Sequence, residues 1–454
     1  YSPLHHLLLN DVNMPVVATS GNFSDEPIIC DEARALERLS GVADVFLVHN
    51  RPIVRPLDDS VTQVVLNEAQ ILRRARGYAP APVTAARLAS GILALGGHLK
   101  ASVAVTCEAG VVLSQHLGDL HTPAARDAYA IARADVVRLF AARPRLVVRD
   151  LHPDYATSQT AGATGLPIAG VQHHVAHVAA CMAEHALVPP VLGVAWDGLG
   201  YGADGTIWGG EFLAIEQSGW KRAAHLRPFH LVGGNAAIRE PARSALGLLF
   251  EVFGEDALDM TDLAPVSHFN TAERTVLLGM LQRGINAPLT TSAGRLFDAF
   301  AALCRLCQRA DYEGEAASVL EWSSQKVTAG DGNFYLPLQR TDAACWQVDW
   351  GPALRQTIAE LRAGRSVGTL SAKLHTALAN AIAEVSQRLG AKRVVLTGGC
   401  FQNSLLTEQT VCALHAVGCQ PFWHRRVPPN DGGIALGQVA WAAWSEQKEQ
   451  APCA

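Results

Sequence analysis

The sequence predicts an α/β protein with a small N-terminal α/β part, followed by a larger part built from two similar halves. The chain has 454 residues, which is longer than one hydrophobic core usually serves. Its first part alternates short β-branched runs with a helical segment, as α/β domains do. In the remainder, three strand-like runs occur twice, each time with a helix and a buried strand further along the chain.

The N-terminal part extends over residues 1–80. Residues 12–19 and 45–49 are rich in β-branched side chains and are predicted as strands, and the stretch 31–39 between them is predicted as a helix. Pro80 and Pro82 favour an extended backbone, because proline restricts its own conformation and that of the residue before it. We therefore expect a linker at residues 81–90.

The larger part extends over residues 91–445 and is followed by a short tail, 446–454. Its first half has three strand-like runs in 92–116, a helix at 122–140 and a strand at 145–150. Its second half has three such runs in 191–215, then a helix at 371–389, a strand at 393–399 and a final helix after Asn430. Two lobes of this kind make up the actin/sugar-kinase (ASKHA) plan, in which a ligand lies in the cleft between the lobes.

The composition excludes several classes of partner. A net charge of −5 provides no positive field for nucleic acid, and no apolar run is long enough to cross a bilayer. The ten cysteines lack the spacing of a disulfide module, which favours the reducing cytoplasm. Cys304 and Cys307 form a CxxC inside a helix-like run and are predicted as buried thiols, since no second pair stands at zinc-ribbon spacing.

Two histidines are the first candidates for a metal site. His173 and His177 are four residues apart in the predicted helix 171–185, so their rings lie on one side and can share one metal ion. A lone HxxxH also occurs by chance on helix surfaces. No Glu follows His173, which disfavours the HExxH chemistry of zincin proteases.

Two carboxylates have two interpretations each. Asp197 ends an apolar strand and precedes several glycines, so it is either a cation ligand or the start of a hairpin turn. Asp431 precedes a helix of small residues, so it is either a helix cap or a carboxylate that joins the histidines in a mixed site.

Other motifs suggest nucleotide binding. Gly398 and Gly399 follow a strand and precede a helix that bears Asn403, where backbone amides can hold phosphate and the Asn side chain can bond a nucleoside. Asp298 shares a helical side with Arg295, so it either forms an ion pair or binds ribose. In the N-terminal part, Ser20 and Asn22 occupy a polar turn.

Arginines follow that turn in the sequence. Arg55 and Arg76 belong to an arginine-rich stretch, 51–76, that either binds phosphate groups or forms a solvated edge.

Taken in chain order, these motifs resemble those of the HypF-type carbamoyltransferases. The C-terminal part of a YrdC-like domain is similar to ATSGN, RPLDDS and RRARGYAP. The TsaD-like domain that follows it in this family is similar to LALGGHLK, LSQHLGDL, DLHPDY, VQHHVAHVAAC, DGLGYGADGTIWGGEF, SAGRLFDA, YEGEAA, LTGGCFQN and NDGGIALGQ. The resemblance therefore covers nearly the whole chain.

The resemblance implies a chemistry for each part. The YrdC-like part would bind ATP with Mg²⁺ and form carbamoyl-adenylate from carbamate, itself derived from carbamoyl phosphate, at Ser20, Asn22, Arg55 and Arg76. The TsaD-like domain would hold one divalent metal ion, Fe or Zn, at His173, His177, Asp197 and Asp431. It would hold the nucleotide at Asp298, Gly314, Gly398, Gly399 and Asn403.

The family's acceptor is the C-terminal Cys thiolate of HypE, whose carbamoyl group becomes the cyanide ligand of NiFe-hydrogenase. The resemblance begins within the YrdC-like domain, so we expect a cytoplasmic enzyme that retains the final transfer step. The alternatives are a small-molecule O-carbamoyltransferase and an inert scaffold that docks HypE. A tRNA threonylcarbamoyl-transferase is disfavoured by the order of the two domains and by the lack of a basic patch.

Overall fold

The computed structural model describes residues 2–24, 26–84, 88, 90–324, 333–341 and 345–450. Its N-terminal part has two helices, α1 (Pro3–Val12) and α2 (Glu32–Leu39), and an antiparallel hairpin of β1 (Val61–Val65) and β2 (Glu68–Arg73). The predicted helix at 31–39 is confirmed: it begins after Asp31, whose carboxylate accepts the backbone N–H of Arg34.

The predicted strands at 12–19 and 45–49 are wrong. Neither run pairs with another strand among the described residues, and Val17 and Val45 are 100% and 83% exposed. A strand requires a neighbouring backbone to take its N–H and C=O groups, so β-branched composition alone is not sufficient. These runs instead connect the elements as irregular chain.

The first lobe contains a sheet with the strand order β3-β6-β5-β4-β7-β8. β4, β5 and β6 form an antiparallel meander, and β7 and β8 are added in parallel beside β4. The bounds are β3 (Pro82–Thr84), β4 (Ile92–Ala94), β5 (Ala104–Cys107), β6 (Gly110–Leu113), α3 (Pro123–Leu139), β7 (Leu146–Asp150), α4 (Ala156–Thr160) and β8 (Ile168–Val171). The elements predicted at 92–116, 122–140 and 145–150 are all present.

Part of the predicted linker, 81–90, belongs to this sheet. Residues 82–84 form β3, which pairs with β6. Residues 85–87 and 89 lie outside the described part of the chain.

The second lobe repeats this arrangement in a larger sheet with the order β14-β15-β11-β10-β9-β16-β17, to which β12 and β13 are attached. β9, β10 and β11 form the antiparallel meander, and β16 and β17 are added in parallel beside β9. The bounds are β9 (Val191–Tyr201), β10 (Ile207–Glu216), β11 (Gly219–Leu226), β12 (Phe229–His230), β13 (Leu289–Thr290), β14 (Leu338–Arg340), β15 (Trp346–Val348), β16 (Arg393–Thr397) and β17 (Gln420–Trp423).

The shared strand order confirms the two-lobed actin/sugar-kinase-like fold. One detail of the prediction is wrong: residues 191–215 hold two strands, not three. β9 and β10 are 11 and 10 residues long and use up that segment, so the third strand begins only at Gly219.

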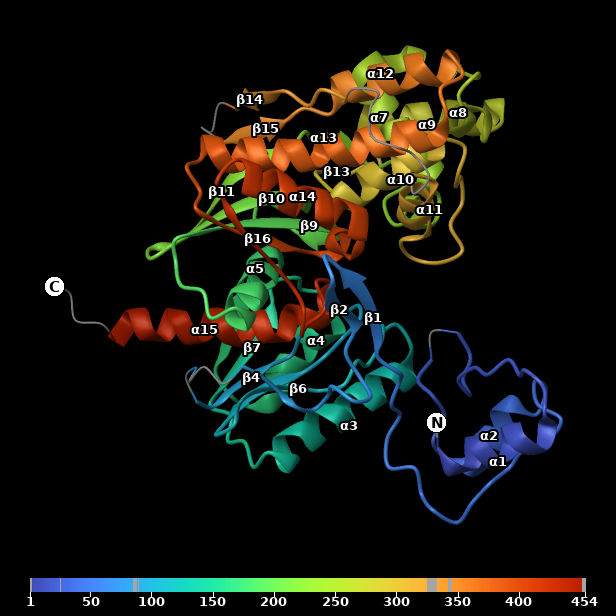
Figure 1. Cartoon of the computed structure of the whole chain (residues 1–454), viewed down its shortest axis with the longest axis vertical. Coiled ribbons are helices and arrows are strands. Elements are labelled where there is room, and N and C mark those ends of the chain that lie inside the picture. Colours follow the sequence, from blue (N-terminus) through green and yellow to red (C-terminus); the bar gives the residue numbers. More distant parts are fainter. Residues whose placement is uncertain are drawn as a thin grey trace.

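Helices cover the second lobe, as Figure 1 shows in its upper half. Their bounds are α6 (Ala236–Arg239), α7 (Pro241–Phe253), α8 (Ala264–Ser267), α9 (Thr271–Arg283), α10 (Ala293–Leu303), α11 (Glu315–Ser323), α12 (Gly351–Arg362), α13 (Val367–Arg388) and α14 (Ser404–Ala416). The helix predicted at 371–389 is α13, which begins earlier because Ser366 caps it.

Two helices, α5 (His173–Glu184) and α15 (Ile434–Gln450), lie side by side between the lobes (Figure 1). Every residue of α5 is buried. One hydrophobic cluster joins both helices to the two sheets, for example Val178 of α5, Leu436 of α15, Ile92 of β4 and Leu213 of β10. α15 includes residues 446–450, which the sequence assigned to a tail.

The hairpin β1–β2 packs onto the second lobe, although it precedes the domain boundary predicted at residue 80. The side chain of Gln63 donates to the carbonyl of Gln402 at 2.8 Å, and the carboxylate of Glu408 accepts the backbone N–H of Leu66 at 3.2 Å. Among the described helices, none combines the length and the apolar character that a membrane span requires.

Candidate metal centre between the lobes

Four side chains direct their ligand atoms at one another at the centre of the molecule. His173 and His177 project from α5, Asp197 from β9, and Asp431 from the short turn that precedes α15. One ligand atom of each lies within 4.8 Å of all the others, and all four residues are buried. The imidazole Nε2 atoms are 3.5–3.8 Å from the nearest oxygens of the two carboxylates.

The positions of Asp197 and Asp431 in the structure bear on the two interpretations of each. Asp197 lies inside β9, which continues to Tyr201, so it does not start a hairpin turn. Asn430, not Asp431, caps the turn before α15, since its side chain accepts the backbone N–H of Gly432 at 3.0 Å. Both aspartates therefore have oxygens that face the histidines.

The residues fit a divalent metal ion. The Nε2 atoms of His173 and His177 are buried and have no hydrogen-bond partner among the described residues. Buried polar atoms are nearly always paired in folded proteins, so an additional group is expected here. In a tetrahedral site with bonds of about 2.1 Å, ligand atoms lie roughly 3.4 Å apart. Two imidazole nitrogens and two carboxylate oxygens suit both zinc and iron.

Asp150, the last residue of β7, supports this centre and was not among the predicted site residues. Its Oδ2 accepts the Nδ1–H of His173 at 2.8 Å, and its Oδ1 accepts the backbone N–H of His152 at 2.8 Å. Such a carboxylate fixes the ring of a metal-binding histidine and leaves Nε2 facing the metal. Two sequence signals pointed to it: its position at the end of a predicted buried strand, and its place as the first residue of the motif DLHPDY.

The carboxylates of Asp150 and Asp431 favour a positive charge on the His173 ring. Burial by itself disfavours a charged imidazole, but Asp431 and Asp150 raise the pKa of His173 well above its ordinary value. The next residue, His174, has no comparable pair of carboxylate partners, and burial lowers the pKa of its ring. A Cβ at Gly200 would lie 2.4 Å from the His174 ring and 2.8 Å from the His173 ring, so the glycine-rich segment after Asp197 makes room for both rings.

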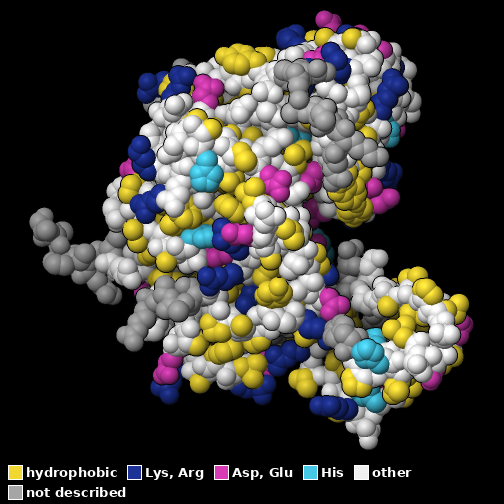
Figure 2. All heavy atoms as spheres, in the orientation of Figure 1, with side chains coloured by type: hydrophobic (Ala, Val, Ile, Leu, Met, Phe, Trp, Pro, Cys, Tyr) yellow, Lys and Arg dark blue, Asp and Glu magenta, His cyan; other side chains and the backbone are white. Residues whose placement is uncertain are grey.

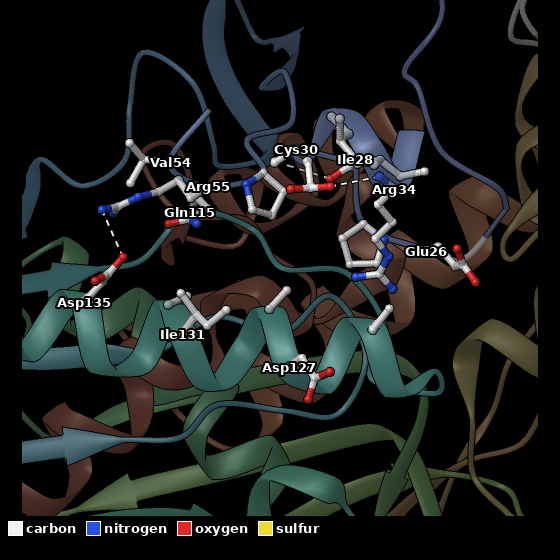
Figure 3. A pocket seen from close by; sticks show the side chains of 17 residues that line it. Glu26, Ile28, Cys30, Arg34, Val54, Arg55, Gln115, Asp127, Ile131 and Asp135 are labelled. Atoms are coloured by element: carbon white, nitrogen blue, oxygen red, sulfur yellow. Dashed lines mark hydrogen bonds and ion pairs between the residues drawn. The ribbon is translucent and has the colours of Figure 1, made fainter. Parts of the chain in front are cut away.

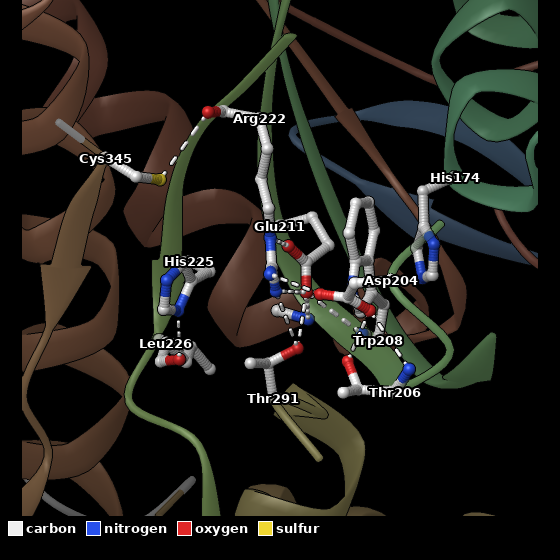
Figure 4. Close-up of polar contacts among 12 residues, drawn as sticks. His174, Asp204, Thr206, Trp208, Glu211, Arg222, His225, Leu226, Thr291 and Cys345 are labelled. Carbon is white, nitrogen blue, oxygen red and sulfur yellow. Dashed lines mark hydrogen bonds and ion pairs between the residues drawn. The ribbon is translucent and has the colours of Figure 1, made fainter. Parts of the chain in front are cut away.

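Asp197 is held in place by hydrogen bonds from the second lobe. Its Oδ1 accepts the backbone N–H of Gly399 at 2.9 Å, and its carbonyl accepts the hydroxyl of Ser292 at 3.0 Å. The preceding residue, Thr291, donates to the buried carboxylate of Glu211, which also pairs with Arg222 at 2.5 Å (Figure 4). This polar cluster fixes the start of α10 against β9 and thereby the ligand Asp197.

The residues predicted to bind a nucleotide belong to the second lobe, and of these Gly399 contacts Asp197. Gly398 has a positive φ of 94° and begins the turn that brings Gly399 to Asp197. Gly314, with a φ of 81°, caps α11. Asn403 caps α14 through Oδ1, and its Nδ2 donates to His375 Nε2 at 2.8 Å, so its side chain also has a structural role.

Asp298 forms the ion pair that its sequence spacing suggested. Its Oδ2 lies 2.7 Å from Arg295 Nη1, and both side chains are buried. A role of Asp298 in binding ribose remains a prediction.

The residues predicted for an ATP and carbamate site have different partners in the structure. Ser20 and Asn22 form one turn, in which Asn22 donates to the carbonyls of Phe23 and Glu26. Arg76 pairs with Asp59 at 3.0 Å. Arg55 pairs at 3.0 Å with Asp135 on α3.

Arg55 and Asp135 also line a cavity of ≈ 220 Å³ between α3 and two stretches of the N-terminal part, 26–34 and 54–56 (Figure 3).

Comparisons with known proteins agree with this division of the chain. A family model described as "Carbamoyltransferase, Kae1-like Domain, second subdomain" matches residues 193–438, more than half of the chain. A "HypF Kae1-like domain" model matches residues 87–184. The Sua5/YciO/YrdC model, described as "Telomere recombination", matches residues 1–75.

Curated relatives are similar over almost the whole chain. This chain is 44% identical to Carbamoyltransferase HypF of Synechocystis sp. in a match that covers 97% of this chain. It is 41% identical to Carbamoyltransferase HypF of Rhodobacter capsulatus in a match that covers 98% of this chain. It spans only 58% and 59% of these two relatives. It covers 96% of a carbamoyltransferase HypF homolog of Cupriavidus necator, at 36% identity over 80% of this chain.

Two solved structures are also similar. Full-length HypF in a phosphate- and nucleotide-bound form is 36% identical, with a TM-score of 0.92, and the match covers 100% of this chain and 59% of that one. HypF of T. kodakarensis is 31% identical, with a TM-score of 0.86, over 95% of this chain and 57% of that one. The chain therefore belongs to the HypF carbamoyltransferase family.

Proposed function

We propose that this chain transfers the carbamoyl group of carbamoyl-adenylate to the C-terminal Cys thiolate of HypE. The observation that carries the proposal is the buried cluster of His173, His177, Asp197 and Asp431 between the lobes of a chain in the HypF family. Such a cluster can hold a divalent metal ion, whose positive charge would attract the phosphate of an acyl-adenylate. The proposal concerns the transfer step, because the chain spans 58% of its Synechocystis relative.

One zinc or iron ion is the proposed resident metal. When bound by these four residues, it would supply positive charge that stabilises the phosphate of the leaving nucleotide. The protein contributes the orientation of the ligands, through Asp150 behind His173 and Gly399 behind Asp197. The packing of the two lobes around the site contributes burial, which strengthens each electrostatic interaction.

The nucleotide is proposed to lie on the second-lobe side, near Asp298, Gly314, Gly398, Gly399 and Asn403. A relative at 36% identity has been solved in a phosphate- and nucleotide-bound form, which supports a nucleotide ligand. Formation of the adenylate from ATP, Mg²⁺ and carbamate is assigned to the YrdC-like part, with Ser20, Asn22, Arg55 and Arg76 as its candidates in this chain.

A cytoplasmic location is part of the same proposal. Every cysteine that the structure describes is a free thiol, as expected in a reducing compartment. Burial raises the pKa of Cys304 to about 12 and that of Cys307 to about 11, so both behave as inert buried thiols.

The direct test supplies pre-formed carbamoyl-adenylate to the purified, metal-loaded chain together with HypE. We expect HypE to gain the mass of one carbamoyl group on its C-terminal Cys, with release of AMP. The variant His173→Ala/His177→Ala should lose this activity, and HypE with its terminal Cys replaced by Ser should gain no mass. Binding of HypE without transfer would favour the scaffold alternative, and transfer to small hydroxyl compounds alone would favour an O-carbamoyltransferase.

A further inference from the structure

A buried arginine beside the metal centre has no role in the chemistry proposed so far. Arg295 lies in the first turn of α10 and is only 4% exposed. Its guanidinium is charged at every physiological pH, and it carries five N–H donors in a planar fork. A charge this deeply buried requires partners for those donors.

The partners within the protein leave the fork incompletely used. Nη1 pairs with Asp298 Oδ2 at 2.7 Å and donates to the carbonyl of Ile238 at 3.5 Å. Nε is buried and has no hydrogen-bond partner among the described residues. One carboxylate therefore supplies most of the compensation for this cation.

The guanidinium lies against the backbone that carries a metal ligand. Nη2 is 3.9 Å from the position that a Cβ of Gly198 would take, and Gly198 directly follows Asp197. α10 begins at the same corner, since Ser292 caps it and donates to the carbonyls of Asp197 and Gly198. A helix start adds positive potential, so two cationic features flank this side of the metal ligands.

The charge on Asp298 is itself costly at this place. Burial raises its pKa to about 6 although Arg295 lowers it, and Glu313 adds a further increase. Since Glu313 pairs with Lys100 of the first lobe, the carboxylates near Arg295 are already shared among several cations.

We propose that Arg295 binds the phosphate of the nucleotide and that Asp298 orients its guanidinium through their ion pair. A phosphate matches the planar fork with two parallel hydrogen bonds. During the proposed transfer, the carbon–oxygen bond to the phosphate breaks, its electron pair stays on the phosphate oxygen, and the thiolate forms the carbon–sulfur bond. Arg295 then faces the additional negative charge of the leaving AMP. This inference rests on the proposed function.

The test compares AMP with adenosine, which differ only in the phosphate. Calorimetric titration of the whole metal-loaded chain should show that Arg295→Gln weakens AMP binding by about 10- to 100-fold, the range for a charged hydrogen bond, and leaves adenosine binding unchanged. Arg362→Gln is the matched control: Arg362 pairs with Asp262 at 2.7 Å on the surface of the same lobe, and its loss should change neither affinity.

Two further variants complete the test. Asp298→Asn should weaken AMP binding, because the guanidinium of Arg295 loses the carboxylate that orients it. Arg295→Lys keeps the charge but not the fork, so it should weaken AMP binding less than Arg295→Gln does, and it serves also if the Gln variant does not fold.

The outcomes separate this inference from the proposed function. Equal loss of AMP and adenosine binding in Arg295→Gln, or no loss of either, would overturn the phosphate role. Unchanged AMP binding in Asp298→Asn would overturn the orienting role of Asp298. If the unaltered chain binds neither compound, the proposed nucleotide site itself is wrong, and this inference with it.

Discussion

At the scale of single residues, the proposed metal centre depends on side chains that do not face the four candidate ligands' common point. Asp150 is fully buried, and its two oxygens are used by His173 Nδ1 and by the backbone of His152. It therefore selects the tautomer in which Nε2 of His173 has its lone pair free. Orientation of a ligand ring is a tertiary property, since β7 and α5 meet only in the folded chain.

This role predicts the effect of Asp150→Asn. The amide cannot act as a charged acceptor for His173, so we expect metal affinity to fall by about 10- to 100-fold. Competition with a chelator of known affinity measures this directly. Asp135→Asn is the matched control: it removes a carboxylate on α3 that pairs with Arg55, and it should leave metal affinity unchanged. Equal metal affinities of the chain and Asp150→Asn would rule out the supporting role.

At the scale of elements, the packing of α15 on α5 decides whether Asp431 reaches the histidines. Gly437 of α15 is the closest point of approach: a Cβ there would lie 1.7 Å from the carbonyl oxygen of Ala176 and 2.9 Å from the nitrogen of Ala180. Only glycine permits this contact. Asp431 lies just before α15, so any movement of that helix also moves the carboxylate.

Gly437→Val should therefore separate the two helices. We expect a loss of at least about 1–3 kcal/mol in the free energy of unfolding, the usual range for overpacking, and a loss of bound metal. Urea unfolding and metal analysis measure the two effects. Gly279→Ala in α9 is the matched control, because a Cβ there meets nothing within 4 Å, and it should stabilise the chain by roughly 0.5–1 kcal/mol.

A buried polar network at the other end of α5 makes stability dependent on pH. Glu184 accepts the backbone N–H groups of Arg425 and Arg426 and lies 3.1 Å from His424. Burial lowers the pKa of His424 below 6.5, although Glu184 opposes the shift. Burial alone would raise the pKa of Glu184, but His424 and the backbone of Arg426 lower it below 4.5.

Both shifts mean that the unfolded chain binds more protons than the folded one. The stabilisation is complete above pH 6.5 and is lost as the pH falls, first through protonation of unfolded His424 and then of Glu184. In His424→Gln, the first contribution is absent. The difference in free energy of unfolding between the chain and this variant should shrink from pH 7 to pH 5; a difference that is constant with pH would contradict this reasoning.

At the scale of the whole molecule, the described residues before Val65 stand apart from the cores. None of the described residues before Val65 is buried, and neither α1 nor α2 contains a buried residue. Large apolar side chains such as Leu7, Val17 and Val45 are more than half exposed, and hydrophobic atoms cover much of this part in Figure 2. The hydrophobic clusters of the lobes are built without it.

A chain that begins at residue 57 should therefore keep the two-lobed fold and its metal. We expect a change in the free energy of unfolding of less than about 1 kcal/mol, because the ion pair that joins the removed residues to the lobes, Arg55–Asp135, is partly exposed. Urea unfolding and metal analysis of both forms provide the measurement. A large loss of cooperativity in the shorter chain would show that residues 1–56 belong to the folded body.

The sequence by itself determined the local structure of this protein and the chemical types of its site residues. Helix periodicity located α3, α5 and α13, and the repeated strand pattern indicated two lobes, because periodicity reports which face of an element is buried. The pair His173 and His177 is also local, since one turn of α5 sets it. Tertiary structure decided what these elements meet.

Tertiary structure alone brought Asp431 to the histidines, placed Asp150 behind His173, and set Arg295 beside Asp197. It also left the runs 12–19 and 45–49 without strand partners. The physical reason is the same in each case. Contacts between residues distant in sequence depend on sheet order and on helix packing such as that at Gly437, and no local pattern encodes either.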